Sequence, residues 1–147
     1  MIEGVQIKKL ITHTDEGGSF TEIIRSDDKF FDEGFGQWSH SIKHQGVIKA
    51  WHIHRYQVDW WYVPFGAMKA VVWDAEQIGG AHQEFLMGPE YENIVLKISP
   101  GIAHGFEVLQ GPCHLLYITS KVYNPEDEGR ISYLEGNYDW LKTKKIN

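Results

Sequence analysis

Short runs in which hydrophobic and polar residues alternate follow one another along almost the whole chain. Alternation with a period of two places successive side chains on opposite faces of a β-strand. Turn-forming pairs that contain glycine interrupt the runs at residues 79–80, 88–89, 100–101 and 111–112. Residues 36–43 form the clearest run, with Gln37, Ser39 and Ser41 on one face and Trp38, His40 and Ile42 on the other.

This pattern predicts about ten β-strands and little helix. The expected strands cover residues 5–11, 19–25, 36–43, 47–54, 57–64, 67–74, 83–87, 93–98, 104–109 and 113–119. Residues 138–145 are expected to form a short helical tail. Many short strands with so little helix predict an all-β sandwich or barrel.

Composition and charge narrow the class of protein. The 147 residues are enough to bury a core, and we expect a single domain over residues 1–147. The net charge of −6, with no basic cluster, argues against nucleic acid and anionic membranes as partners. No apolar run approaches the roughly 18 residues that span a bilayer. The N-terminus has no signal-peptide pattern and Cys113 is the only cysteine, so we expect a cytoplasmic protein without disulfides.

Three histidines and one aspartate are the candidate functional residues. His52 and His54 lie two positions apart on one expected strand, so both project from the same face. Asp59 follows after a bend, and His104 follows a Pro-Gly turn at residues 100–101. Three imidazoles and a carboxylate brought together can form a metal site or an acid–base site, and the residues alone leave both open.

The spacing of these residues resembles the cupin motifs. Gly46, His52, His54, Asp59 and Gly66 follow the first cupin motif, with aspartate where glutamate is usual. The segment PGIAH at residues 100–104 is similar to the core of the second motif. The resemblance implies an all-β cupin fold, a double-stranded β-helix or jelly-roll barrel, with its ligand site inside.

More of the chain resembles the dTDP-4-dehydrorhamnose 3,5-epimerase family, a branch of the cupins. Five segments are similar in order between about residues 4 and 131. They are DEGGSFTE at 15–22, QWSHS at 37–41, GVIKAWH at 46–52, SPGIAHGF at 99–106 and LLYITSKVYNPEDEGRI at 115–131. An ordered series of this length is much harder to obtain by chance than one motif.

The resemblance implies a sugar-nucleotide epimerase or keto-isomerase that removes a proton beside the 4-keto group of a nucleotide-linked 4-keto-6-deoxysugar. It implies no cofactor, a homodimer, and a place in cell-surface polysaccharide or deoxysugar biosynthesis. By matched position, His52 is the base, Tyr117 is the opposing acid, and His104 lies near the keto oxygen. Asp59 is included in the expected catalytic group, and three roles stay open for it: to orient His52, to complete a metal site, or to be a strand-end carboxylate. The expected substrate-binding residues are Glu22, Gln37, Lys49, Tyr123 and Glu128.

The chain differs from the family pattern at several positions that carry a charge in the family. Gly17 and Lys49 stand where the family has arginines that hold the diphosphate, and lysine lacks arginine's bidentate fork. Asp59 replaces a lysine, and His54 replaces a glutamine. These differences predict a phosphate grip rebuilt around other cations, for which Lys49, Arg25 and Arg55 are the nearest candidates in sequence.

Two alternatives remain beside the epimerase. One is a metal-dependent cupin with His52, His54, Asp59 and His104 around one divalent transition metal, such as Fe, Mn, Ni or Zn. The other is a non-catalytic sugar-binding cupin. We favour the epimerase because the similarity covers most of the chain; metal analysis and solvent deuterium uptake would separate the three.

Overall fold

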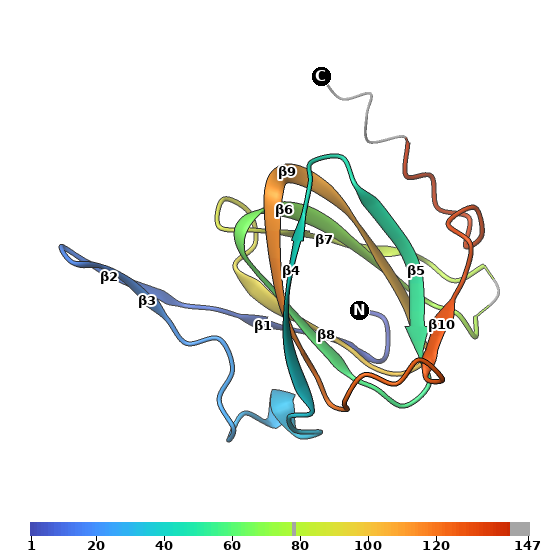
Figure 1. Cartoon of the computed structure of the whole chain (residues 1–147), viewed down its shortest axis with the longest axis horizontal. Coiled ribbons are helices and arrows are strands. Elements are labelled where there is room, and N and C mark those ends of the chain that lie inside the picture. Colours follow the sequence, from blue (N-terminus) through green and yellow to red (C-terminus); the bar gives the residue numbers. More distant parts are fainter. Residues whose placement is uncertain (78, 142–147) are drawn as a thin grey trace.

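Two long strands form the frame of the molecule. In the computed structural model, which describes residues 1–77 and 79–141, β6 (Asp59–Asp74) and β9 (Ile102–Thr119) pair antiparallel along most of their length. Each bends along its course, so its two halves meet different neighbours: β6 pairs with β8 through its first half and with β7 through its second. Figure 1 shows the strands curving round into a barrel.

The remaining strands complete the barrel in the order β1-β8-β6-β9-β5-β10, with β4 added to β9 and β7 to β6. Their bounds are β1 (Val5–Lys9), β4 (Gln37–Lys43), β5 (Ile48–His54), β7 (Gln83–Met87), β8 (Ile94–Ile98) and β10 (Glu128–Arg130). All pairings in this sheet are antiparallel. The predicted all-β cupin barrel is therefore confirmed.

A two-stranded hairpin extends away from the barrel (Figure 1). It consists of β2 (Thr12–Asp15) and β3 (Gly18–Thr21), joined by a tight turn in which the Gly17 amide donates to the Asp15 carboxylate at 2.7 Å. Only one strand was predicted here, over 19–25. A short 3-10 helix, η1 (Lys29–Phe31), follows and packs its aromatic side chains beside the outer face of the barrel.

Two pairs of predicted strands are in fact two continuous strands. The predicted strands 57–64 and 67–74 join in β6, and those over 104–109 and 113–119 join in β9. The gap between the first two predicted strands contains Gly66, which adopts a φ of +77°, a region that disfavours other residues. A Cβ at Gly66 would lie 2.5 Å from the Pro112 carbonyl oxygen, so glycine lets the two strands stay paired through the bend.

The main hydrophobic cluster fills the barrel on the side of β6, β8 and β9. Met68, Ala70, Val72 and Leu96 have no exposed surface there, and the burial of each large side chain contributes roughly 1.5–3 kcal/mol. A second cluster, centred on the fully buried Trp51, covers the outer face of β5. The alternation of β4 is as predicted, because Trp38, His40 and Ile42 are exposed and their neighbours are half-buried.

The C-terminal segment differs from expectation. Strand β10 lies where no strand was predicted, and it pairs with β5. Of the predicted helical tail, residues 138–141 form an irregular segment with a turn, and residues 142–145 lie outside the described residues. Within the described chain, no helix combines the length and the apolar character needed to cross a bilayer.

Candidate active site

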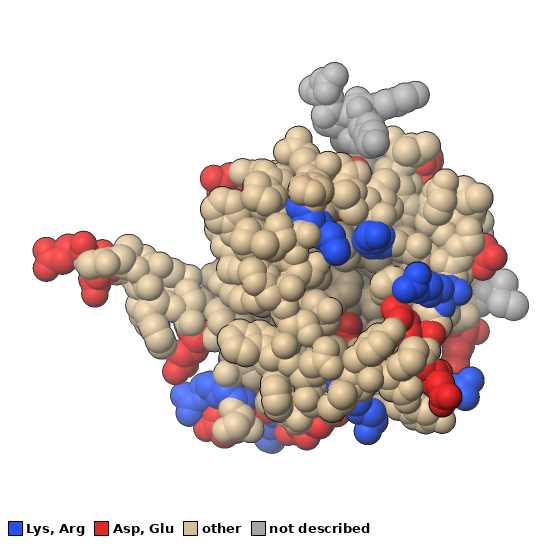
Figure 2. All heavy atoms as spheres, in the orientation of Figure 1, with Lys and Arg blue, Asp and Glu red and all other residues tan. Residues whose placement is uncertain are grey.

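A cavity of about 460 Å³ opens into the barrel between β4, β5, β6, β9 and β10. The lining is mixed: carboxylate, imidazole and phenol groups lie beside Trp61, Phe106 and Leu115. Figure 2 shows a hollow on this face with Lys and Arg atoms at its edge. Eight of the nine predicted catalytic and substrate-binding residues line this cavity; they are His52, Asp59, His104, Tyr117, Gln37, Lys49, Tyr123 and Glu128.

His52 and Glu128 form an ion pair across two neighbouring strands. The antiparallel register of β5 and β10 places Glu128 opposite His54 and one diagonal step from His52. The His52 Nδ1 atom lies 3.6 Å from a Glu128 carboxylate oxygen. Burial lowers the pKa of His52 below its ordinary value, while the Glu128 charge opposes this shift. The imidazole is therefore neutral near pH 7 and can accept a proton, and the carboxylate can stabilise the imidazolium that results.

His104 lies deeper, on the first half of β9. It is directly paired with His52 in the register of β5 and β9, and only 3% of its surface is exposed. Its Nδ1 atom donates to the Ile102 carbonyl at 3.0 Å, which leaves Nε2 as the unprotonated nitrogen. Burial lowers the pKa of His104 well below its usual range, so the ring is a neutral hydrogen-bond acceptor in the wall of the cavity.

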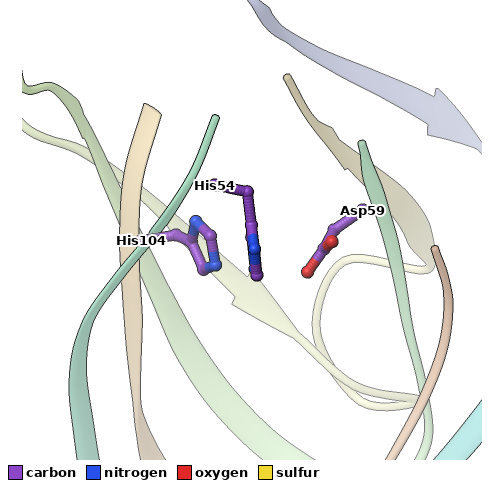
Figure 3. Close-up of side chains that lie close together, drawn as sticks. All are labelled: His54, Asp59 and His104. Atoms are coloured by element: carbon purple, nitrogen blue, oxygen red, sulfur yellow. The ribbon is translucent and has the colours of Figure 1, made fainter. Parts of the chain in front are cut away.

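His54, Asp59 and His104 form a compact group at the buried end of the cavity (Figure 3). One nitrogen or oxygen from each lies within 4.8 Å of the others. The His54 and His104 rings stack with centroids 5.5 Å apart. The metal set predicted from sequence also included His52, which does not belong to this group among the described residues.

Two neighbours orient the Asp59 carboxylate. The Gln57 amide donates to Oδ1 at 2.7 Å, and the Trp61 indole donates to Oδ2 at 3.2 Å. Asp59 is 4% exposed, so these bonds replace water around a buried charge. Gln57 and Trp61 were not predicted as site residues, because nothing in the motif spacing marks them.

Tyr117, Gln37 and Tyr123 line the outer part of the cavity. Tyr117 lies on the second half of β9, paired with Ser39 of β4 and with Trp61 of β6. The Gln37 side chain accepts from the Tyr123 amide at 3.0 Å and donates to the Ser39 hydroxyl at 3.1 Å. Gln37 therefore holds the segment that carries Tyr123, whose side chain is exposed beside the cavity.

Cations at the cavity are only partly those predicted. Lys49 lines it, together with Lys43 and Arg130, which sequence reasoning missed because they belong to no motif. Arg25 does not line it, and its guanidinium is paired with Asp27 at 2.8 Å. Arg55 lies at a separate hollow beyond β10, also lined by Glu126 and Asp127.

Glu22 is the predicted substrate residue that the structure does not bring to the cavity. It follows β3, its side chain is 57% exposed, and it lies 3.8 Å from the Arg25 guanidinium. Its position at the base of the projecting hairpin separates it from the other site residues of the same chain.

The chain is similar to proteins of one known family. The family described as dTDP-4-dehydrorhamnose 3,5-epimerase matches the chain over residues 1–145. The spore coat polysaccharide biosynthesis protein SpsL of Bacillus subtilis (strain 168) is 40% identical over 139 residues, covering 90% of this chain and 91% of SpsL.

Solved structures show the same fold. A dTDP sugar isomerase from Desulfovibrio desulfuricans G20 superposes with a TM-score of 0.85 at 23% identity, covering 95% of this chain and 92% of that one. The epimerase RmlC from Legionella pneumophila Philadelphia 1, in complex with dTDP-4-keto-L-rhamnose, superposes with a TM-score of 0.78 at 26% identity. That comparison covers 91% of this chain and 76% of RmlC.

Proposed function

Because this chain belongs to the dTDP-4-dehydrorhamnose 3,5-epimerase family of sugar-nucleotide epimerases and isomerases, we propose that it removes and returns a proton beside the 4-keto group of a nucleoside-diphosphate 4-keto-6-deoxysugar. The family resemblance expected from the sequence is thereby confirmed. The observation that carries the reaction itself is the His52–Glu128 pair inside a cavity of about 460 Å³.

In this proposal His52 is the general base. A neighbouring carbonyl acidifies the C–H bond, and a neutral imidazole is suited to take that proton. Glu128 holds the ring through Nδ1, which directs Nε2 to the substrate, and its charge stabilises the protonated ring. Glu128 is therefore a positioning residue here, rather than only the ligand contact that its sequence position implied.

Tyr117 returns the proton in this proposal. If the acid lies on the face of the sugar opposite His52, protonation inverts the carbon. Its position on the second half of β9, away from the His52–His104 pairing, supports this assignment. In this proposal the keto oxygen of the sugar points toward the buried end of the cavity, which His104 lines.

The nucleotide diphosphate is held by cations at the mouth of the cavity. Lys43, Lys49 and Arg130 line it, and the chain as a whole carries a net charge of −6. A dianionic group is therefore attracted by these few side chains rather than by the protein as a whole. The bound nucleotide sugar of the Legionella RmlC structure supports this ligand class.

The name of the Bacillus relative supports a place in polysaccharide biosynthesis. Two copies of the chain forming a homodimer are also part of this proposal. The projecting β2–β3 hairpin supports it, because every residue of the two strands except Thr21 is exposed. Phe20 in that hairpin has 63% of its surface exposed.

Proton NMR in D₂O tests the function. The protein is incubated with dTDP-4-keto-6-deoxyglucose, and the signals of the protons on C3 and C5 are followed. We expect loss of at least one of these signals and the appearance of an inverted sugar. Binding of the nucleotide sugar without any exchange would contradict the proposal and favour the non-catalytic sugar-binding alternative.

A further inference from the structure

The buried carboxylate of Asp59 has no cationic partner within the described part of the chain. Among residues 1–77 and 79–141, the ion pairs formed within 4.0 Å do not include Asp59. Its two hydrogen bonds come from neutral groups, Gln57 and Trp61. A carboxylate that is 4% exposed and lacks a counter-charge is costly to bury, so this position calls for a positive charge.

His104 presents a lone pair next to this carboxylate. A backbone carbonyl can only accept, so the 3.0 Å contact between Nδ1 and the Ile102 oxygen requires the proton on Nδ1. The unprotonated Nε2 atom is then available to a ligand. Histidines that bind metals commonly donate their other nitrogen to a backbone carbonyl in this way, which fixes the tautomer.

His54 supplies a second ring with an unused nitrogen. Its Nδ1 atom is buried and has no hydrogen-bond partner in the described part of the chain. The Nε2 atom has only a long contact of 3.5 Å to the Gln57 amide. Since a buried polar atom without a partner is uncommon and costs free energy, His54 carries a second, independent sign of a missing ligand.

We propose that His54, Asp59 and His104 bind one divalent transition-metal ion at the buried end of the cavity. Their ligand atoms lie within 4.8 Å of one another and come from three different strands, β5, β6 and β9 (Figure 3). Atoms bound at about 2.1 Å from one ion are about 3 to 4 Å apart, so small side-chain rotations complete the site. The Gln57 and Trp61 hydrogen bonds hold the carboxylate as outer-shell partners of metal ligands do.

The donor set selects the class of ion. Two imidazoles and one carboxylate suit Zn²⁺, Mn²⁺, Fe²⁺, Co²⁺ or Ni²⁺, whereas Mg²⁺ and Ca²⁺ prefer oxygen ligands. Three protein ligands leave open positions, and these face the cavity that also holds His52. His52 stays outside the metal group and remains free to act as a base.

The site extends the proposed function and departs from the cofactor-free expectation. If the chain acts on a 4-keto sugar, an ion held by His54, Asp59 and His104 would supply positive charge near the keto oxygen while His52 takes the proton. This use rests on the proposed function, but metal binding does not.

Metal binding is measured without any sugar nucleotide. The full chain is stripped with a chelator, dialysed, and titrated separately with Zn²⁺, Mn²⁺, Co²⁺ and Ni²⁺ by calorimetry. Bound metal is then counted after gel filtration. We expect one ion per chain, a rise in melting temperature, and a visible absorption band for the Co²⁺ form. Failure of every ion to bind stoichiometrically would overturn the proposal, whatever the enzymatic activity.

Two variants localise the ion. His54→Gln and Asp59→Asn should each weaken binding more than about tenfold. Asp59→Asn also removes an uncompensated buried charge, so the metal-free variant should melt no lower than the wild type, while its metal-induced rise disappears.

The matched control is His114→Gln. The His114 Nδ1 atom lies 2.9 Å from His40 Nε2 on the exterior, so these two rings form a separate histidine pair that could attract an ion. This variant should keep the stoichiometric site. Binding that survives in His54→Gln and Asp59→Asn but disappears in His114→Gln would assign the ion to the surface pair and refute the buried site.

Discussion

The role of Glu128 depends on a strand pairing that the sequence does not reveal. Motif comparison marked it as a ligand contact, but its carboxylate lies 3.6 Å from His52 because β10 pairs with β5. Spacing alone was enough to find His52, His54, Asp59 and His104, because the cupin motifs have their functional residues at those positions. Lys43, Arg130 and Gln57 could not, because only the folded barrel brings them to the cavity.

Glu128→Gln should lower the rate constant for proton exchange by about tenfold or more and change KM little, because it removes the charge that stabilises protonated His52. Steady-state kinetics of the exchange reaction measure both quantities. Glu126→Gln is the matched control, since Glu126 is exposed at the separate hollow. Equal rates in wild type and Glu128→Gln would remove Glu128 from the mechanism.

Tyr117→Phe should separate the two halves of the reaction. Proton removal by His52 continues, while inversion slows by about 100-fold or more because the phenolic donor is absent. Comparing deuterium uptake with product stereochemistry distinguishes these steps. Tyr91→Phe, an exposed tyrosine between β7 and β8, should match the wild type. Full-rate inversion by Tyr117→Phe would exclude it as the acid.

The predicted strands differ from the observed ones where pairing with a neighbouring strand, rather than local sequence, determines the strand. The long strands β6 and β9 were predicted as four, because glycine and proline usually end a strand. Gly66 instead lets the chain bend where no other side chain fits. Strand β10 was missed because Glu128–Arg130 has no hydrophobic alternation, and its extended form depends on hydrogen bonds to β5. Local pattern therefore predicts strands whose residues alternate or are apolar, and it misses a short strand whose extended form depends on pairing alone.

The turn between β5 and β6 depends on one carboxylate at the start of β10. Asp127 accepts from the amides of Arg55, Tyr56 and Gln57 at 2.9, 3.0 and 3.2 Å. Asp127→Ala should lower the free energy of unfolding by about 3 kcal/mol, since it leaves one buried and two partly buried amides without acceptors.

Chemical denaturation measures this loss. Asp15→Ala is the control, because Asp15 caps an exposed turn and should cost under about 1 kcal/mol. A loss no larger for Asp127→Ala than for Asp15→Ala would show that the turn does not depend on Asp127.

At the scale of the whole molecule, a chain with an excess of acidic residues places a few cations at the cavity. The net charge is −6, yet Lys43, Lys49 and Arg130 line the cavity. Lys and Arg atoms lie at the edge of the hollow in Figure 2. Lys49→Ala and Arg130→Ala should each weaken dTDP binding about tenfold at low salt, and less at high salt, because the groups are exposed and screened.

Calorimetry with dTDP at two salt concentrations measures this effect. Lys29→Ala, on the exposed side of η1, should leave the affinity unchanged. Unchanged affinity in both cavity variants would show that the diphosphate is held elsewhere.

The most direct measurement of the central claim is solvent deuterium incorporation by His52→Asn. This variant keeps a side chain of similar polarity but removes the base, so we predict that incorporation into dTDP-4-keto-6-deoxyglucose falls by at least about 100-fold while the melting temperature is unchanged. His44→Asn, an exposed histidine outside the cavity, should incorporate deuterium at the wild-type rate. Wild-type incorporation by a folded His52→Asn protein would contradict the account.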